Sequence, residues 1–100
     1  MTGPHESHRM DWEGSALSVR WCPAWLARSE GYAIAHLEII ADNRAVLPVT
    51  ETGYRSHFVP REAVEALGGP VAYVRAWLDH EAQSSAWKAH RAASRQLSLF

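Results

Sequence analysis

Residues 33–40 carry the most constraining pattern in this chain, a period of two in which every second side chain is apolar. The first set is entirely apolar and comprises Ala33, Ala35, Leu37 and Ile39. The second set mixes apolar with polar side chains and comprises Ile34, His36, Glu38 and Ile40. Because successive side chains of a strand point to opposite faces of a sheet, the alternation predicts a strand with one face against a core.

Two further extended segments follow this strand. Asp42-Asn43 is typical of a turn, and the apolar run at residues 45–50 after it predicts the second arm of a hairpin. Pro48 within that run lacks an amide hydrogen, which favours an edge or a bulge. Residues 54–59 alternate again and stop at Pro60. The sequence therefore predicts a three-stranded antiparallel meander.

Prolines and glycines divide the second half of the chain into two predicted helices. Pro60 suits the first position of a short helix that Gly68-Gly69 ends, and Pro70 suits the first position of a longer one. The longer helix has an apolar stripe formed by Val71, Val74, Leu78, Ala82, Ala89 and Ala93. The stripe thins beyond Gln83, where we expect the helix to bend or project. Helices packed on the meander give an α+β fold.

Two segments in the first half of the chain have no strand pattern. Residues 1–14 contain few apolar residues, which predicts a mobile N-terminal tail. Pro23 interrupts the aromatic segment that contains Trp21 and Trp25, which favours a short helix that starts near Pro23. One hundred residues suffice for one small core. We therefore expect a single domain over residues 15–95 and a separate peptide at residues 96–100.

Composition excludes several classes of function. The formal net charge is −1, so no overall basic field draws the chain to nucleic acid or anionic lipid, and any contact with DNA would be weak or indirect. No apolar stretch predicts membrane insertion or export. Cys22 is the single cysteine, so no disulfide forms within the chain. These features predict a cytoplasmic protein with no membrane partner.

The most specific motif is formed by Gln96, Leu97, Ser98, Leu99 and Phe100. It resembles the pentapeptide by which bacterial polymerases, mismatch-repair proteins and clamp-loader subunits attach to the DNA sliding clamp, the β subunit of DNA polymerase III. The resemblance implies that Gln96 hydrogen-bonds at the rim of a clamp pocket, while Leu97, Leu99 and Phe100 fill apolar subsites. Ser98 would face outward or contact the rim. The protein would act either as a recruited client or as a competitor of replication and repair factors.

The physical properties of these five residues support the same interpretation. Large apolar side chains close to the end of the sequence have no later residues to cover them, so they need a partner or a groove. The alternative is that they fold back onto the protein's own sheet and complete its core. Exposure of Leu99 and Phe100 is therefore the condition for clamp binding.

A second candidate surface lies in residues 51–58, where Tyr54, Arg55 and His57 could form a binding patch or an acid–base site. The alternative, which we favour, is a half-buried edge strand whose polar side faces water. Residues 51–58 and 68–74 are similar to stretches in small uncharacterised proteins of proteobacterial plasmids and integrated elements. That resemblance implies a mobile-element origin, such as a plasmid or phage-like region, and no particular activity.

The sequence predicts neither a metal site nor an enzyme. Six histidines are present, but no His-Glu-x-x-His string occurs, and His80 and His90 are too far apart on one helix to share an ion. Cys22 is typical of an inert buried thiol. No phosphate-binding glycine loop and no Gly-x-Ser-x-Gly motif occurs. We therefore expect no cofactor and no catalytic residue.

The last predicted helix offers a local basic surface. Its residues Trp87, Lys88, Arg91 and Arg95 could contact nucleic acid by stacking and by pairing with phosphates. A solvated helix face with one amphipathic tryptophan is the simpler interpretation. Three functions thus stay open: clamp binding, which the pentapeptide favours, a nucleic-acid-binding accessory role, and inhibition of a host defence system (anti-CRISPR or anti-restriction) through protein contact.

Overall fold

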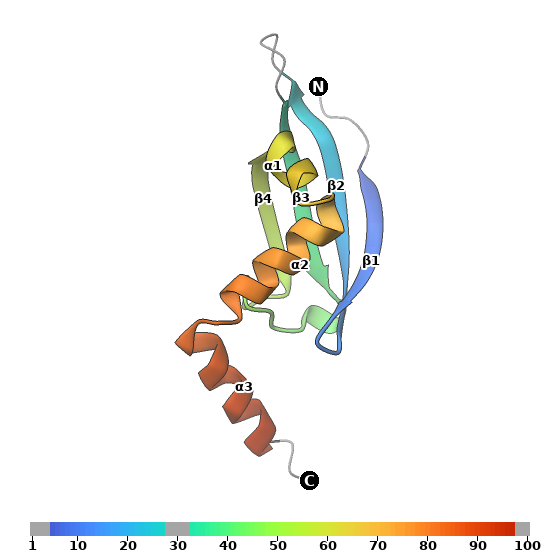
Figure 1. The fold of residues 1–100 in the computed structure, drawn as a ribbon. Coiled ribbons are helices and arrows are strands. Elements are labelled where there is room, and N and C mark those ends of the chain that lie inside the picture. The colour runs from blue at the N-terminus through green and yellow to red at the C-terminus, as the bar shows by residue number, and fades with distance from the viewer. Residues whose placement is uncertain (1–4, 28–32, 98–100) are drawn as a thin grey trace.

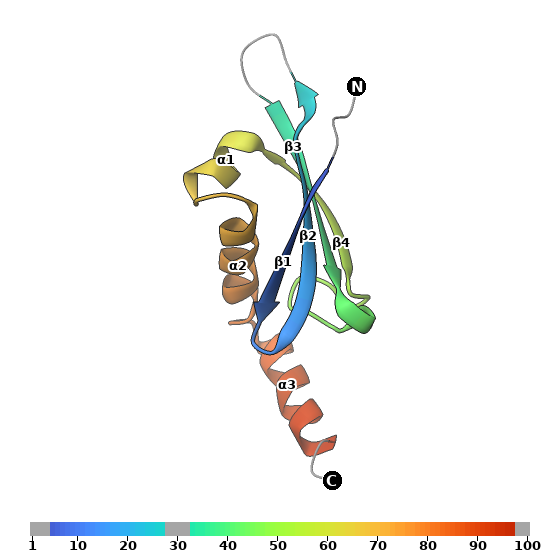
Figure 2. The same ribbon diagram turned by 90° about the vertical axis from the view of Figure 1, so that its right-hand side faces the viewer.

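A computed structural model, which describes residues 5–27 and 33–97, has an α+β fold built on a four-stranded sheet (Figure 1). The elements are β1 (Glu6–Trp12), β2 (Ser15–Ala27), β3 (Ala33–Ala41), η1 (Asp42–Arg44), β4 (Tyr54–Pro60), α1 (Arg61–Ala66), α2 (Pro70–Glu81) and α3 (Ser85–Leu97). All neighbouring strands are antiparallel, in the order β1-β2-β3-β4. Helices α1 and α2 cover one face of the sheet, and α3 projects beyond its end (Figure 2).

Strand β1 occupies a segment that the sequence predicted to be part of a mobile tail, so that prediction was wrong for residues 6–12. The strand pairs with β2 along its whole length and is connected to it by Glu13 and Gly14, which both have positive φ, as in a type I′ turn. Met10 and Trp12 are buried on the core side. Pairing with β2 and burial of these two side chains make the segment a strand despite its polar composition.

Strand β2 also corrects the sequence analysis, because no helix starts near Pro23. Between the pairs Cys22–His36 and Leu26–Ile34, β2 has three intervening residues and β3 has one. A β-bulge of this kind accommodates a proline that lacks a ladder donor. Pro23 also lies beyond the end of β1, whose last partner on β2 is Trp21. The strand can therefore continue through the proline.

The predicted hairpin between residues 33–40 and 45–50 does not form, because β3 pairs with β2 on one side and with β4 on the other. The apolar run makes only a tight turn, closed by hydrogen bonds between Leu47 and Thr50 of 2.9 and 3.0 Å. Leu47 and Val49 are nevertheless buried in the core. These two apolar side chains therefore pack into the core instead of forming a strand. The fold is a four-stranded meander instead of the predicted three-stranded one.

The core lies between the sheet and the two covering helices. As the alternation predicted, Ala35, Leu37 and Ile39 are fully buried on one face of β3. The fully buried core residues contributed by β2, α1 and α2 are Leu17, Val19, Val64, Val74 and Leu78. Burying each such side chain contributes roughly 1.5–3 kcal/mol to stability.

The predicted prolines and glycines mark the start and end of α1 and the start of α2. Pro60 precedes α1, Gly68 and Gly69 end it with positive φ, and Pro70 starts α2. The expected change of direction beyond Gln83 is a complete break, after which the Ser84 Oγ accepts a 3.1 Å hydrogen bond from the Trp87 amide and caps α3. No helix in the described part of the chain is long and apolar enough to cross a membrane.

Candidate functional site

Helix α3 carries the start of the predicted clamp-binding peptide. The helix extends through Leu97, so the backbones of Gln96 and Leu97 belong to its last turn. Ser98, Leu99 and Phe100 lie outside the described residues. The boundary predicted at residue 96 therefore differs from the observed helix end, because the alanine-rich segment before it favours helix and propagates it two residues further.

Two side chains hold α3 against the body of the molecule. Trp87 is half-buried and packs on the buried Trp12, with ring centroids 5.8 Å apart. Arg91 forms an ion pair with Glu13 in the β1–β2 turn. The remaining described side chains of α3 are exposed. The molecule is consequently elongated, 56 × 23 × 19 Å, with α3 at one end (Figure 1).

The candidate nucleic-acid residues do not form one free basic surface. Trp87 packs against Trp12 and stacks on His90 with centroids 5.0 Å apart, and the Arg91 guanidinium is paired with a carboxylate. Lys88 is exposed, and the side chain of Arg95 lies outside the described part of α3. Two of the four candidates are thus used in contacts within the chain.

The structure does not bring Tyr54, Arg55 and His57 together either. Arg55 and His57 point toward α2, where the guanidinium lies 5.4 Å from the Trp77 ring centroid and the imidazole 4.5 Å from it. Tyr54 lies on the opposite face and donates a 2.6 Å hydrogen bond to Glu38. Because consecutive strand residues alternate between faces, the three cannot share one patch. The edge position in the favoured alternative is observed, because β4 lies at the sheet edge. Its polar side does not simply face water, since Arg55 and His57 lie against Trp77.

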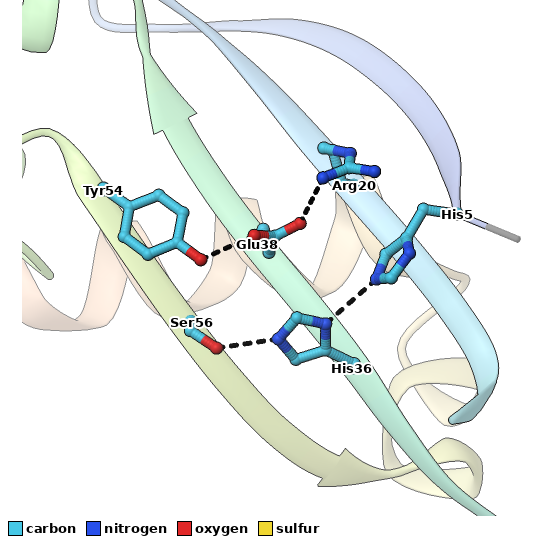
Figure 3. Close-up of polar contacts among 6 residues, drawn as sticks. All are labelled: His5, Arg20, His36, Glu38, Tyr54 and Ser56. Atoms are coloured by element: carbon cyan, nitrogen blue, oxygen red, sulfur yellow. Dashed lines mark hydrogen bonds and ion pairs between the residues drawn. The ribbon is translucent and has the colours of Figure 1, made fainter. Parts of the chain in front are cut away.

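The face of the sheet without helices carries a polar network (Figure 3). Its residues lie on β2, β3 and β4, together with His5, which immediately precedes β1. At its centre, Glu38 accepts hydrogen bonds of 2.6 Å from Arg20 on β2 and from Tyr54 on β4. Beside it, His36 Nδ1 lies 3.0 Å from His5 Nε2, and His36 Nε2 lies 2.7 Å from Ser56 Oγ. We call His5, Arg20, His36, Glu38, Tyr54 and Ser56 the open-face network.

Aromatic side chains shield the histidine end of this network. The rings of Trp25 and Phe58 lie 4.6 and 4.7 Å from that of His36, and they contact each other at 5.7 Å. His36 is therefore buried, with 6% of its surface exposed, although its strand face has no helix over it. Phe58 itself is 55% exposed and shields His36 from solvent.

Burial and hydrogen bonding shift the ionisation of several groups. Burial lowers the pKa of His36 and of His57 below the ordinary histidine value of 6.5. The hydrogen bond from the Tyr54 hydroxyl lowers the pKa of Glu38, and the same bond raises the pKa of Tyr54. Near neutral pH the network therefore combines a neutral imidazole at His36 with an ionised carboxylate at Glu38.

Sequence reasoning missed the open-face network, although one signal was present. The alternation in residues 33–40 placed His36 and Glu38 on the same face. Their partners were missed because Arg20 lies on β2, where no strand was predicted, and His5 precedes β1, which was assigned to a tail. The Glu13-Gly14 pair, flanked by alternating residues, was the signal for the missing hairpin.

Comparison with protein families relates most of this chain to a known domain. A family model described as the KlcB third domain matches residues 5–87. The match includes the four strands, α1, α2 and the start of α3, and it ends before the pentapeptide. No curated protein and no solved structure significantly matches the chain.

Proposed function

The chain belongs to the family of KlcB third domains, and we propose that it is a non-enzymatic cytoplasmic binding protein that docks on the bacterial DNA sliding clamp through residues 96–100. The family is plasmid-associated, which suits a protein that acts on the replication or repair machinery of a host. The family model stops at residue 87. Docking is thus a proposed property of this chain's last segment.

The observation that carries the proposal is the Gln-Leu-Ser-Leu-Phe sequence at the end of a projecting helix. Only Trp87 and Arg91 among the described side chains of α3 are not exposed. A ligand that binds near residue 97 would therefore approach a helix surrounded by solvent on most sides. This arrangement supports insertion of the following residues into a cleft of another protein without a clash with the sheet.

The energetics of such docking are favourable but modest. Burial of Leu99 and Phe100 in apolar subsites would contribute roughly 1.5–3 kcal/mol each, and hydrogen bonds of Gln96 about 1 kcal/mol. Extended binding also requires Gln96 and Leu97 to leave the last turn of α3, where helix ends fray at little cost. With Leu97 contributing as well, these gross terms come to roughly 5.5–10 kcal/mol, so a micromolar Kd, roughly −8 kcal/mol, requires that the ordering costs stay small.

The test is isothermal titration calorimetry of the whole chain against purified sliding clamp. We expect a micromolar Kd that a Leu99→Ala, Phe100→Ala double variant weakens at least about tenfold, since two apolar anchors are lost. Ser98→Ala is the matched control and should change the Kd less than about twofold. Undiminished heat from the double variant, or no heat from the unaltered chain, contradicts the proposal.

Salt separates clamp docking from nucleic-acid binding. An apolar peptide in a pocket should keep its affinity as salt rises from about 50 to 200 mM, whereas phosphate contacts would lose affinity steeply. Inhibition of a defence system by the globular part is a third possibility, and it would survive removal of residues 96–100. Docking through the pentapeptide would not survive that truncation.

A further inference from the structure

Three potential metal-ligand atoms come together in the open-face network, from residues far apart in the sequence. The ligand atoms of His5, His36 and Glu38 all lie within 4.8 Å of one another. Zn–N bonds are about 2.0–2.1 Å long, so two imidazole nitrogens that share a tetrahedral ion lie about 3.3 Å apart. The observed separation between His5 Nε2 and His36 Nδ1 is 3.0 Å. The two rings are thus already close to a shared-ion arrangement.

The partner of His36 has the geometry expected for support of a metal ligand. Its Nε2 lies 2.7 Å from Ser56 Oγ, which can accept the hydrogen on that nitrogen. The lone pair of Nδ1 then points toward His5. Metal-bound histidines usually donate their second ring N–H to such an outer partner, which fixes the tautomer and the ring orientation.

Glu38 completes the set of donors. Its carboxylate accepts hydrogen bonds from Arg20 and Tyr54, which hold it beside His36. Each carboxylate oxygen has two lone pairs, so an oxygen that already accepts one hydrogen bond can still bind an ion.

We propose that His5, His36 and Glu38 form a binding site for a divalent transition-metal ion, with Zn²⁺ as the best-matched ion. Two imidazoles and one carboxylate suit zinc, and they leave a fourth position for water or another ligand. Mg²⁺ fits poorly because it prefers oxygen ligands in octahedral geometry. The Trp25 and Phe58 rings would limit solvent access to the ion.

Such an ion would tie the start of the edge strand to the centre of the sheet. His5 immediately precedes β1, and His36 lies on β3, so the ion would span β2 between them. An ion that binds only the folded state would stabilise that state and hold β1 in place. This inference goes beyond clamp docking and does not depend on it, because none of the three ligands belongs to α3 or to residues 96–100.

Calorimetry with Zn²⁺ tests the site on the whole chain, prepared without a polyhistidine tag and stripped of metal by a chelator. We expect about one equivalent of Zn²⁺ to bind and His5→Gln to weaken binding at least about tenfold. Ser56→Ala should weaken it about tenfold through loss of the outer hydrogen bond. His80→Gln, at an exposed histidine of α2 outside the cluster, is the control and should leave the affinity unchanged.

Thermal unfolding supplies a second measurement that distinguishes ligand loss from misfolding. Zn²⁺ should raise the Tm of the unaltered chain and of His80→Gln, but not that of His5→Gln, whose circular dichroism without metal should match the unaltered chain. Mg²⁺ should not raise the Tm. The proposal would be overturned if His5→Gln bound Zn²⁺ as tightly as the unaltered chain, or if Mg²⁺ raised the Tm as much as Zn²⁺. Either result would indicate an adventitious ion only.

Discussion

Gly53 shows how a single residue fixes the long connection between β3 and β4. It is buried with φ of +82°, and its carbonyl accepts a 2.8 Å hydrogen bond from the Ala41 amide. A Cβ atom at this position would lie 2.6 Å from Arg44 Cα. Gly14 also has positive φ, +86°, but a Cβ there would meet nothing within 4 Å. Both positions therefore require a positive φ, but only Gly53 also lacks room for a side chain.

This comparison predicts different costs for two glycine substitutions. Gly14→Ala should lower the free energy of unfolding by about 1–2 kcal/mol, the cost of a side chain in the left-handed region. Gly53→Ala should cost clearly more, because backbone atoms of Arg44 must also move. Chemical denaturation of both variants measures the difference. Equal losses would show that the close approach at Gly53 is unimportant.

Two histidines predict acid sensitivity. Burial lowers the pKa of His36 and His57 in the folded state below the ordinary histidine value of 6.5. Well above pH 6.5 both histidines are neutral in the folded and in the unfolded chain, so their titration costs no stability. As pH falls through 6.5, the unfolded state takes up protons first and stability declines. Replacing His57 by Gln should make the decline between about pH 7.5 and 5.5 shallower, since one of the two groups no longer titrates.

Denaturation at several pH values, with a chelator present, measures this effect. His80→Gln is the matched control because that histidine is exposed on α2, and its variant should keep the full decline. A His57→Gln variant whose stability has the same pH dependence as that of the unaltered chain would contradict a contribution of His57 to acid sensitivity.

At the scale of elements, local pattern predicted β3, β4, α1 and α2 because their signals are contained within each segment. Alternation marked β3 and β4, and Pro60, Gly68-Gly69 and Pro70 marked the helices. Strands β1 and β2 could not be predicted in the same way, since β1 depends on pairing with β2 and β2 passes Pro23 through a bulge. The open-face network was missed for the same reason, because Arg20 lies on β2 and His5 immediately precedes β1.

Helix α3 depends on one tertiary contact more than on its own sequence. An isolated helix of 13 residues is marginal in water, and Trp87 is its main apolar contact with the body. Trp87→Ala should therefore melt much of α3 while the sheet persists, at a cost below the about 3–5 kcal/mol of a fully buried tryptophan. Far-ultraviolet circular dichroism should show a loss of helical signal.

Lys88→Ala is the matched control for Trp87→Ala. Lys88 is exposed on the same turn of α3, and alanine has a high helix propensity. The helical signal should therefore be unchanged or slightly higher. A similar loss of helix in both variants would show that α3 does not rely on Trp87.

At the scale of the whole molecule, two binding regions lie apart. The proposed zinc site is on the open face of the sheet. The proposed clamp-binding segment begins in the last turn of α3, which projects beyond the sheet (Figures 1 and 2). Trp12 and Glu13 at the β1–β2 turn hold α3 in that direction. An elongated domain of this kind can bind a partner at one end while the sheet face stays accessible.

Hydrogen exchange of the chain with and without the sliding clamp tests clamp docking most directly, because it locates the contact. We expect slower exchange in a peptide that contains residues 96–100, and unchanged exchange in β3 and β4. Slower exchange across β3 and β4, with residues 96–100 unaffected, would contradict docking through the pentapeptide and assign the contact to the sheet.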